Sequence, residues 1–230
     1  MAEKITVSVV EARVRDLAAA SVNQTVSLFK GGIFALAAVV LVEIAFSPDD
    51  RTVRLVLWTA SLFAAMTSYN AWLSGAVTMF REGVPVVIAI IAQGMIELML
   101  FATLTPRSTP QAWRYWIVVM AALMFVTGLR LAVPFNKGAE SEPELAPLFD
   151  HVAENRRRAS RRVLGAALAA TLIAFPIVAL PLNSAWPQWL SLAFGVFNIG
   201  FAGFAMIQQQ EERVAIERLL ADAKAPRPAG

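Results

Sequence analysis

Six apolar stretches divide this chain, and each is long enough to cross a lipid bilayer as a helix. Spanning the hydrocarbon core takes about 20 mostly apolar residues. The six stretches are residues 27–47, 55–80, 84–105, 113–135, 163–182 and 188–207. The sequence therefore predicts an all-α, polytopic membrane protein with six transmembrane helices joined by short loops.

The composition agrees with lipid as the main solvent. Hydrophobic residues make up 57% of the 230 positions and charged residues only 16%, which leaves too little polar surface for a water-soluble globule of this size. We expect three parts: residues 1–26 as a cytoplasmic N-terminal segment with an interfacial helix, 27–207 as the six-helix domain, and 208–230 as a cytoplasmic C-terminal helix and tail.

The basic residues predict the orientation of the chain in the membrane. With six spans, 16 of the 20 Lys and Arg residues fall on one side, and only Arg51, Arg54, Arg107 and Arg114 fall on the other. Basic residues are retained in the cytoplasm, so both termini are expected there, in an inner (plasma) membrane of bacterial type. The first 16 residues carry charges throughout and do not form a signal peptide.

Several kinds of chemistry are excluded by what the sequence lacks. The chain has no Cys and one His, which rules out thiolate zinc sites, disulfides and Cys nucleophiles. P-loop, GxGxxG and HExxH motifs are absent, as is the filter of potassium channels. We expect no enzyme, no cofactor and no metal, and His151 as an ordinary exposed residue. Because the basic residues sort by membrane side, they predict contact with lipid and not with nucleic acid.

Glu97 is the most informative single residue. It lies in "IIAQGMIELML", far from both ends of the third apolar stretch. An ionisable side chain at that depth is costly and marks a candidate functional site. No Lys or Arg is expected at the same depth, so we expect Glu97 to be protonated or in contact with water.

The second apolar stretch has two distinct helical faces. One face carries small residues and is expected to pack closely against another helix; its members are Ser61, Ala64, Ala65, Ser68, Ala71 and Gly75. The other is a polar stripe of Thr59, Thr67, Asn70, Ser74 and Thr78. A three-residue link should place the third stretch antiparallel beside the polar stripe, which brings Asn70 level with Gln93 and Thr67 within about 4 Å of Glu97 in height.

The candidate site combines these polar residues into a path through the bundle. Gln93 and Glu97 share a helical face because they are four residues apart. The expected site consists of Glu97, Gln93, Asn70 and Thr67, joined by Asn198 of the last stretch. Such a cluster favours a small channel or transporter that moves an ion, a proton or a small solute.

An alternative assigns Glu97 a structural role. In that case the protein is a non-catalytic subunit of a larger membrane complex, held through the loop 136–162 and the C-terminal helix. A homo-oligomer is expected for the channel, because six short-looped helices leave little room for a wide pore.

Charged residues outside the candidate site have simpler expected roles. The segment "RRRASRR" in the loop 136–162 should contact anionic headgroups; its basic residues are Arg156, Arg157, Arg158, Arg161 and Arg162. Arg130, near the end of the fourth stretch, is expected to reach the interface as a snorkelling anchor. Asp49 and Asp50 are typical of a solvated turn.

Overall fold

The computed structural model describes residues 21–78, 84–106, 111–132, 146–179 and 185–224. Within these ranges the chain forms helices and no strands, which confirms the all-helical prediction. The elements are α2 (Ser21–Phe46), α3 (Arg51–Thr78), α4 (Val84–Ala102), the short 3-10 helix η1 (Ala112–Tyr115), α5 (Trp116–Ala132), α6 (Ala146–Ala179) and α7 (Trp186–Lys224).

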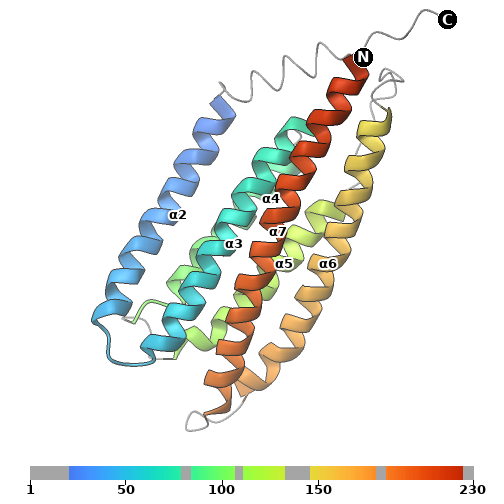
Figure 1. Cartoon of the computed structure of the whole chain (residues 1–230). Helices are drawn as coiled ribbons and strands as arrows, with labels where there is room; N and C mark the ends of the chain where they lie inside the picture. The colour runs from blue at the N-terminus through green and yellow to red at the C-terminus, as the bar shows by residue number, and fades with distance from the viewer. Residues whose placement is uncertain (1–20, 79–83, 107–110, 133–145, 180–184, 225–230) are drawn as a thin grey trace, which may run out of the picture.

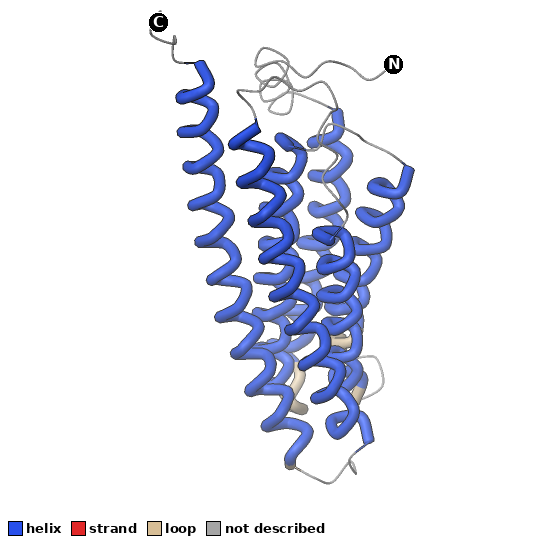
Figure 2. The backbone as a smooth tube through the Cα atoms, turned by 90° about the vertical axis from the view of Figure 1, so that its right-hand side faces the viewer, coloured by secondary structure: helices blue, strands red, loops and turns tan. Residues whose placement is uncertain are grey.

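The long helices run up and down along a common axis (Figure 1). The view turned by 90° shows the same bundle from its side (Figure 2). Helix α2 begins and α7 ends at one end of the bundle, while the turn between α2 and α3 lies at the opposite end. We call these the Glu212 end and the Asp50 end, after residues of α7 and of the α2–α3 turn.

The helices and the surface of the bundle carry extensive apolar residues. Among the described residues, three helices are long and apolar enough to cross a membrane: Ala112–Ala132, Ala146–Ala179 and Trp186–Ala221. Large apolar side chains also face outward, for example Phe46 at 85% and Phe175 at 78% exposure. Exposed apolar surface of this extent is expected where the surrounding solvent is lipid.

Two helix pairs form the closest packing in the bundle: α3 with α7, and α5 with α6. Each pair has a glycine at the contact. A Cβ atom added to Gly195 of α7 would lie 2.8 Å from Val56, and one added to Gly128 of α5 would lie 2.7 Å from Leu164. Small residues allow helix backbones to approach closely in lipid, so these glycines fix the two pairs.

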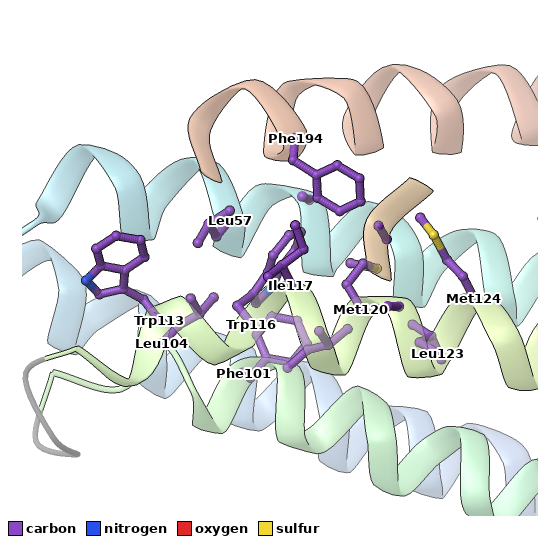
Figure 3. Close-up of a cluster of buried hydrophobic side chains, with 14 of the residues drawn as sticks. Leu57, Phe101, Leu104, Trp113, Trp116, Ile117, Met120, Leu123, Met124 and Phe194 are labelled. Atoms are coloured by element: carbon purple, nitrogen blue, oxygen red, sulfur yellow. The ribbon is translucent and has the colours of Figure 1, made fainter. Parts of the chain in front are cut away.

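Side chains fill the interior toward the Asp50 end (Figure 3). Trp116 is buried and packs edge-on against Phe194, with 6.2 Å between ring centroids. Its indole nitrogen donates a hydrogen bond of 2.7 Å to Ser61 Oγ. Ser61 and Ala65 are both fully buried, which confirms that this part of the small-residue face of α3 packs against other helices.

Two helix boundaries differ from the sequence-based expectations. Residues 146–162 of the expected loop 136–162 are helical, because α6 already begins at Ala146. The apolar residues Leu148, Phe149 and Val152 lie on one face of that helix and are buried, which explains why the charged segment is helical. Helix α2 starts at Ser21 instead of residue 27, and α7 continues to Lys224, as expected for the C-terminal helix. The interfacial helix was expected within residues 1–26, of which 1–20 lie outside the described residues and 21–26 belong to α2.

Candidate functional site

Glu97 forms a buried ion pair with Lys30. The Glu97 side chain is fully buried, and the Lys30 ammonium contacts its Oε2 atom. Lys30 Nζ also donates to Ser68 Oγ at 3.2 Å and to the carbonyl of Ala65 at 3.5 Å. The expectation that no basic residue lies at the depth of Glu97 is therefore wrong.

The start of α2 and the short α2–α3 turn explain this error. Because α2 begins at Ser21, Lys30 lies in its third turn and not at a helix end. Lys30 lies 16 residues before Phe46, and Ser68 lies 17 residues after Arg51, so the two residues have similar depths in antiparallel helices. Counting residues outward from the turn would have placed Lys30 at the depth of Ser68, but not beside Glu97 of α4.

Gln93 connects the ion pair to a second basic residue. Its Nε2 atom donates to Ser68 Oγ and, at 3.5 Å, to Glu97 Oε1, which confirms that Gln93 and Glu97 share a face. Its Oε1 atom accepts a hydrogen bond of 3.0 Å from Arg130. Arg130 therefore points to Gln93 and does not act as the expected snorkelling anchor. Its position in the last turn of α5 favours a cation, because the carbonyl end of a helix is partly negative.

These residues form one ionic network that joins four helices. Lys30 comes from α2, Ser68 from α3, Gln93 and Glu97 from α4, and Arg130 from α5. Taking charges out of water costs several kcal/mol per ion, and their mutual attraction offsets that cost only when partners and hydrogen bonds are in place. The network is thus sensitive to the loss of any one charge.

Thr67 faces a different helix from the one expected. Its hydroxyl donates to the carbonyl of Phe63 at 2.7 Å and lies 3.4 Å from that of Ala202 in α7, and Gln209 of α7 donates to the Thr67 carbonyl at 3.3 Å. The prediction that the polar stripe of α3 faces α4 is therefore wrong at Thr67. The cause is the close packing of α3 with α7, which turns Ser68 toward α4 instead.

Asn70 and Asn198, the two asparagines of the predicted path, lie outside the ionic network. Asn198 is buried on α7 and donates to the carbonyl of Phe194, one turn earlier, at 2.8 Å. Asn70 is half-buried, and in the described part of the chain no hydrogen bond joins it to Gln93 or Glu97. The ionic network contains Gln93 and Glu97 from the prediction, and it adds Lys30, Ser68 and Arg130.

A cavity of about 440 Å³ lies between the α3/α7 pair and the α5/α6 pair. This volume is within the range of small-molecule sites, roughly 300–1,000 Å³. Thr67, Ser68 and Asn198 line its inner part. Apolar side chains of α5 and α7 form much of its wall: Met120, Leu123, Met124 and Phe201.

The cavity has exposed lining residues toward the Glu212 end and buried neighbours toward the Asp50 end. Its outer part is lined by the polar or charged residues His151, Asn155, Arg158, Arg162, Gln208, Gln209, Glu211 and Glu212, of which Arg158, Arg162 and Glu211 are exposed. One helical turn beyond its inner end, Trp116 and Phe194 are packed in the buried cluster of Figure 3.

Ser68 connects the cavity to the ion pair. It lines the cavity, and its oxygen accepts hydrogen bonds from both Lys30 and Gln93. Glu97 itself does not line the cavity, so any effect of a bound solute on the carboxylate passes through Ser68 and Lys30.

The basic segment of α6 is divided between three environments. Arg156 turns inward and donates to the carbonyl of Arg130 at 3.1 Å. Arg162 bonds to Gln208 at 2.6 Å and lies 5.8 Å above the ring of Phe204, and Arg158 pairs with Glu154. Arg157 and Arg161 are exposed. Contact with anionic headgroups stays a prediction for this segment.

His151 also differs from the expectation of an exposed residue. It is half-buried, its Nε2 atom lies 3.0 Å from the side-chain nitrogen of Asn155, and it lines the cavity. The described residues contain no group of three or more His, Asp or Glu side chains that could hold a metal ion.

A second polar cluster at the Asp50 end was not predicted. Asp49 and Asp50 lie in a turn and Asp49 is exposed, as expected; in addition, Asp50 accepts hydrogen bonds of 2.8 Å from the Trp113 indole and from Gln188. Its φ angle is 51°, a left-handed conformation in which Asp and Asn are enriched. The buried Arg54 donates to the carbonyl of Leu104 at 2.8 Å. These contacts tie α3 to η1, α7 and the end of α4.

The fold and the two polar clusters define an all-helical bundle with helices able to cross a membrane. No protein-family model matches the chain, and neither the curated proteins nor the solved structures contain a match.

Proposed function

We propose that this protein is a small integral membrane transporter with six spans and both termini in the cytoplasm, which moves an ion, a proton or a small solute past Glu97. The observation that carries this proposal is the position of a buried ion pair beside a cavity that has polar side chains on a largely apolar wall. Charged residues inside a membrane-spanning bundle are costly and are associated with transport pathways. Here Ser68 lies in both the network and the cavity wall.

The form of the cavity favours a carrier over an open channel. It reaches the surface at the Glu212 end, where Arg158 and Arg162 are exposed, and it ends one turn before Trp116 and Phe194. Carriers expose a binding site to one side at a time, often by moving one helix group against another. The α3/α7 and α5/α6 pairs, with the cavity between them, are suited to such a movement.

Flux through reconstituted protein tests the proposal. Proteoliposomes are loaded with a pH-sensitive dye, subjected to proton, Na⁺ and K⁺ gradients and supplied with small solutes, and the wild type is compared with Glu97→Gln. Gln keeps the shape of Glu97 and removes only the titrating charge. We expect the wild type to give a flux that Glu97→Gln reduces by about tenfold or more, at unchanged protein content.

A matched variant controls for general damage to the bundle. Thr171→Val changes a hydroxyl that bonds within its own helix at 2.9 Å, and it should leave the flux unchanged. Equal flux in the wild type and in Glu97→Gln would refute a transport role for this residue. A wild type without flux under any gradient, purified with a stoichiometric partner from native membranes, would favour the subunit alternative.

A further inference from the structure

The hydroxyl group of Ser68 can act only as a donor toward the cavity. A serine hydroxyl has one proton to donate and two lone pairs that accept. Lys30 Nζ and Gln93 Nε2 both donate to the Ser68 oxygen, so both acceptor positions are used. Because Ser68 also lines the cavity, its proton is available to an acceptor atom of a solute there.

The charge of Lys30 strengthens this donor. An ammonium that donates to an oxygen polarises the O–H bond, and hydrogen bonds in such a chain reinforce one another in a low-dielectric interior. Hydrogen bonds to an ionised acceptor are roughly twice as strong as neutral ones. Ser68 therefore favours an anionic acceptor over a neutral carbonyl group.

The charges around the inner cavity favour an anion as well. In the described residues, the network holds two cations, Lys30 and Arg130, and one carboxylate, Glu97. At the rim, Arg158 and Arg162 are balanced in number by Glu211 and Glu212. The excess positive charge lies at the inner end, where one bound anion would balance it.

The cavity wall limits the rest of the solute. Met120, Leu123, Met124 and Phe201 offer an apolar surface beside Ser68. A small organic acid with an apolar body would place its carboxylate at Ser68 and its body against these side chains, as is usual in sites that combine apolar walls with a few polar groups.

We propose that this cavity binds the carboxylate group of a small organic acid at the Ser68 hydroxyl, with Lys30 as the charge behind it. The inference rests on the proposed transport function and names the class of solute. Ser68 is the binding residue and Lys30 the positioning residue, since Lys30 acts through the serine oxygen.

Isothermal titration of the full-length protein in nanodiscs tests this site with defined probes. The probes are acetate, butyrate and benzoate, each compared with its amide (acetamide, butyramide and benzamide), which has a similar shape but no charge. At least one carboxylate should bind about tenfold or more tightly than its amide. Ser68→Ala should weaken that binding by roughly 10- to 100-fold, the effect of one hydrogen bond to a charged group.

Two variants separate the proposed role of Ser68 from general loss of structure. Ser160→Ala removes a buried hydroxyl that donates to Gly128 and does not line the cavity, so its carboxylate affinity should equal that of the wild type. Glu97→Gln removes the negative charge beside Lys30 and should strengthen carboxylate binding several-fold. A merely structural contribution of Glu97 to the site would instead weaken it.

Each outcome of the titrations decides the proposal. Equal binding of all three acids and their amides, or the same affinity in Ser68→Ala as in the wild type, would overturn the carboxylate site. If these results occur while Glu97-dependent flux persists, the transport function stands and only the solute class is wrong. Carboxylate binding without any flux would retain the site and refute the transport function.

Discussion

The two polar clusters of this protein lie at different depths and are built in different ways. At the Asp50 end, Asp50 accepts hydrogen bonds from the neutral side chains of Trp113 and Gln188, and Arg54 donates to the backbone carbonyl of Leu104. In the ionic network, the carboxylate of Glu97 meets the ammonium of Lys30, with Gln93 and Arg130 beside it.

The difference indicates that only one cluster is suited to change its state. Trp113, which donates to Asp50, belongs to the same packed interior as Trp116 (Figure 3). The Lys30–Glu97 pair adjoins a cavity through Ser68, so a solute can reach its partners. A buried pair is weak evidence for stability, because apolar residues of similar volume often stabilise as well or better. The proposed function therefore involves the ionic network, and the Asp50 cluster is proposed to have a structural role.

The largest effect is expected from removing one charge of the ion pair. Lys30→Met leaves Glu97 buried without its cation and should lower the free energy of unfolding by about 3–5 kcal/mol. The double variant Lys30→Met/Glu97→Leu removes both charges and should recover most of this loss. Denaturant unfolding in mixed micelles measures both variants, and a double variant no more stable than Lys30→Met would contradict the pairing.

The second-largest loss of stability is expected from a larger side chain at Ser68, where the helices pack closely. Ser68→Leu inserts a larger apolar side chain next to Lys30 and Gln93 and should cost about 1–3 kcal/mol, with loss of monodisperse protein. Val42→Leu is the matched control, because Val42 is 56% exposed on the surface of α2 and should tolerate the change. Equal size-exclusion profiles and stabilities for the two variants would argue against close contact at Ser68.

The Asp50 cluster should show a smaller effect. Asp50→Ala removes both accepted hydrogen bonds and places Ala at a positive φ, so we expect a loss of about 2 kcal/mol. Asp49→Ala, at its exposed neighbour, should change the stability by less than about 0.5 kcal/mol. Transport by Asp50→Ala that still folds should match the wild type, and a selective loss of flux would assign function to this end too.

The smallest effect is expected at Thr67, which the sequence placed beside Glu97. Its hydroxyl bonds mainly to its own helix, at Phe63, and Val has nearly the same shape. Thr67→Val should therefore change the stability by less than about 0.5 kcal/mol and leave flux unchanged. A loss of flux comparable to that of Glu97→Gln, measured in the same proteoliposomes, would show that Thr67 takes part in the function of the ionic network.

Periodicity and hydropathy predicted the helices well but could not assign their neighbours. The apolar stretches lie within long helices, and Gln93 and Glu97 share a face, because both properties depend on local spacing. The contact of Lys30 with Glu97 depends on which helices pack together and on the length of the α2–α3 turn. The helix that Thr67 faces depends on the packing of α3 against α7. Gly195 permits this packing, because it lets the two helices approach closely.

The Asp50 cluster was missed for a related reason. Its partners come from residues 113 and 188, which are distant in sequence and carry no pattern that links them to an acidic turn. The early start of α6 was missed because its charged residues hid the apolar positions Leu148, Phe149 and Val152. Hydropathy averages over such a segment, whereas burial follows a single face.

The charge state of Glu97 is the most direct test of the ion pair on which this account depends. Infrared difference spectra between the wild type and Glu97→Gln at neutral pH report on this one side chain. If Glu97 is ionised, as its pairing with Lys30 requires, the variant should lose carboxylate stretching bands. The wild type should then have no carbonyl band of a protonated acid at this position. A carboxylic acid carbonyl band that disappears in Glu97→Gln would show a neutral Glu97 and contradict the ion pair.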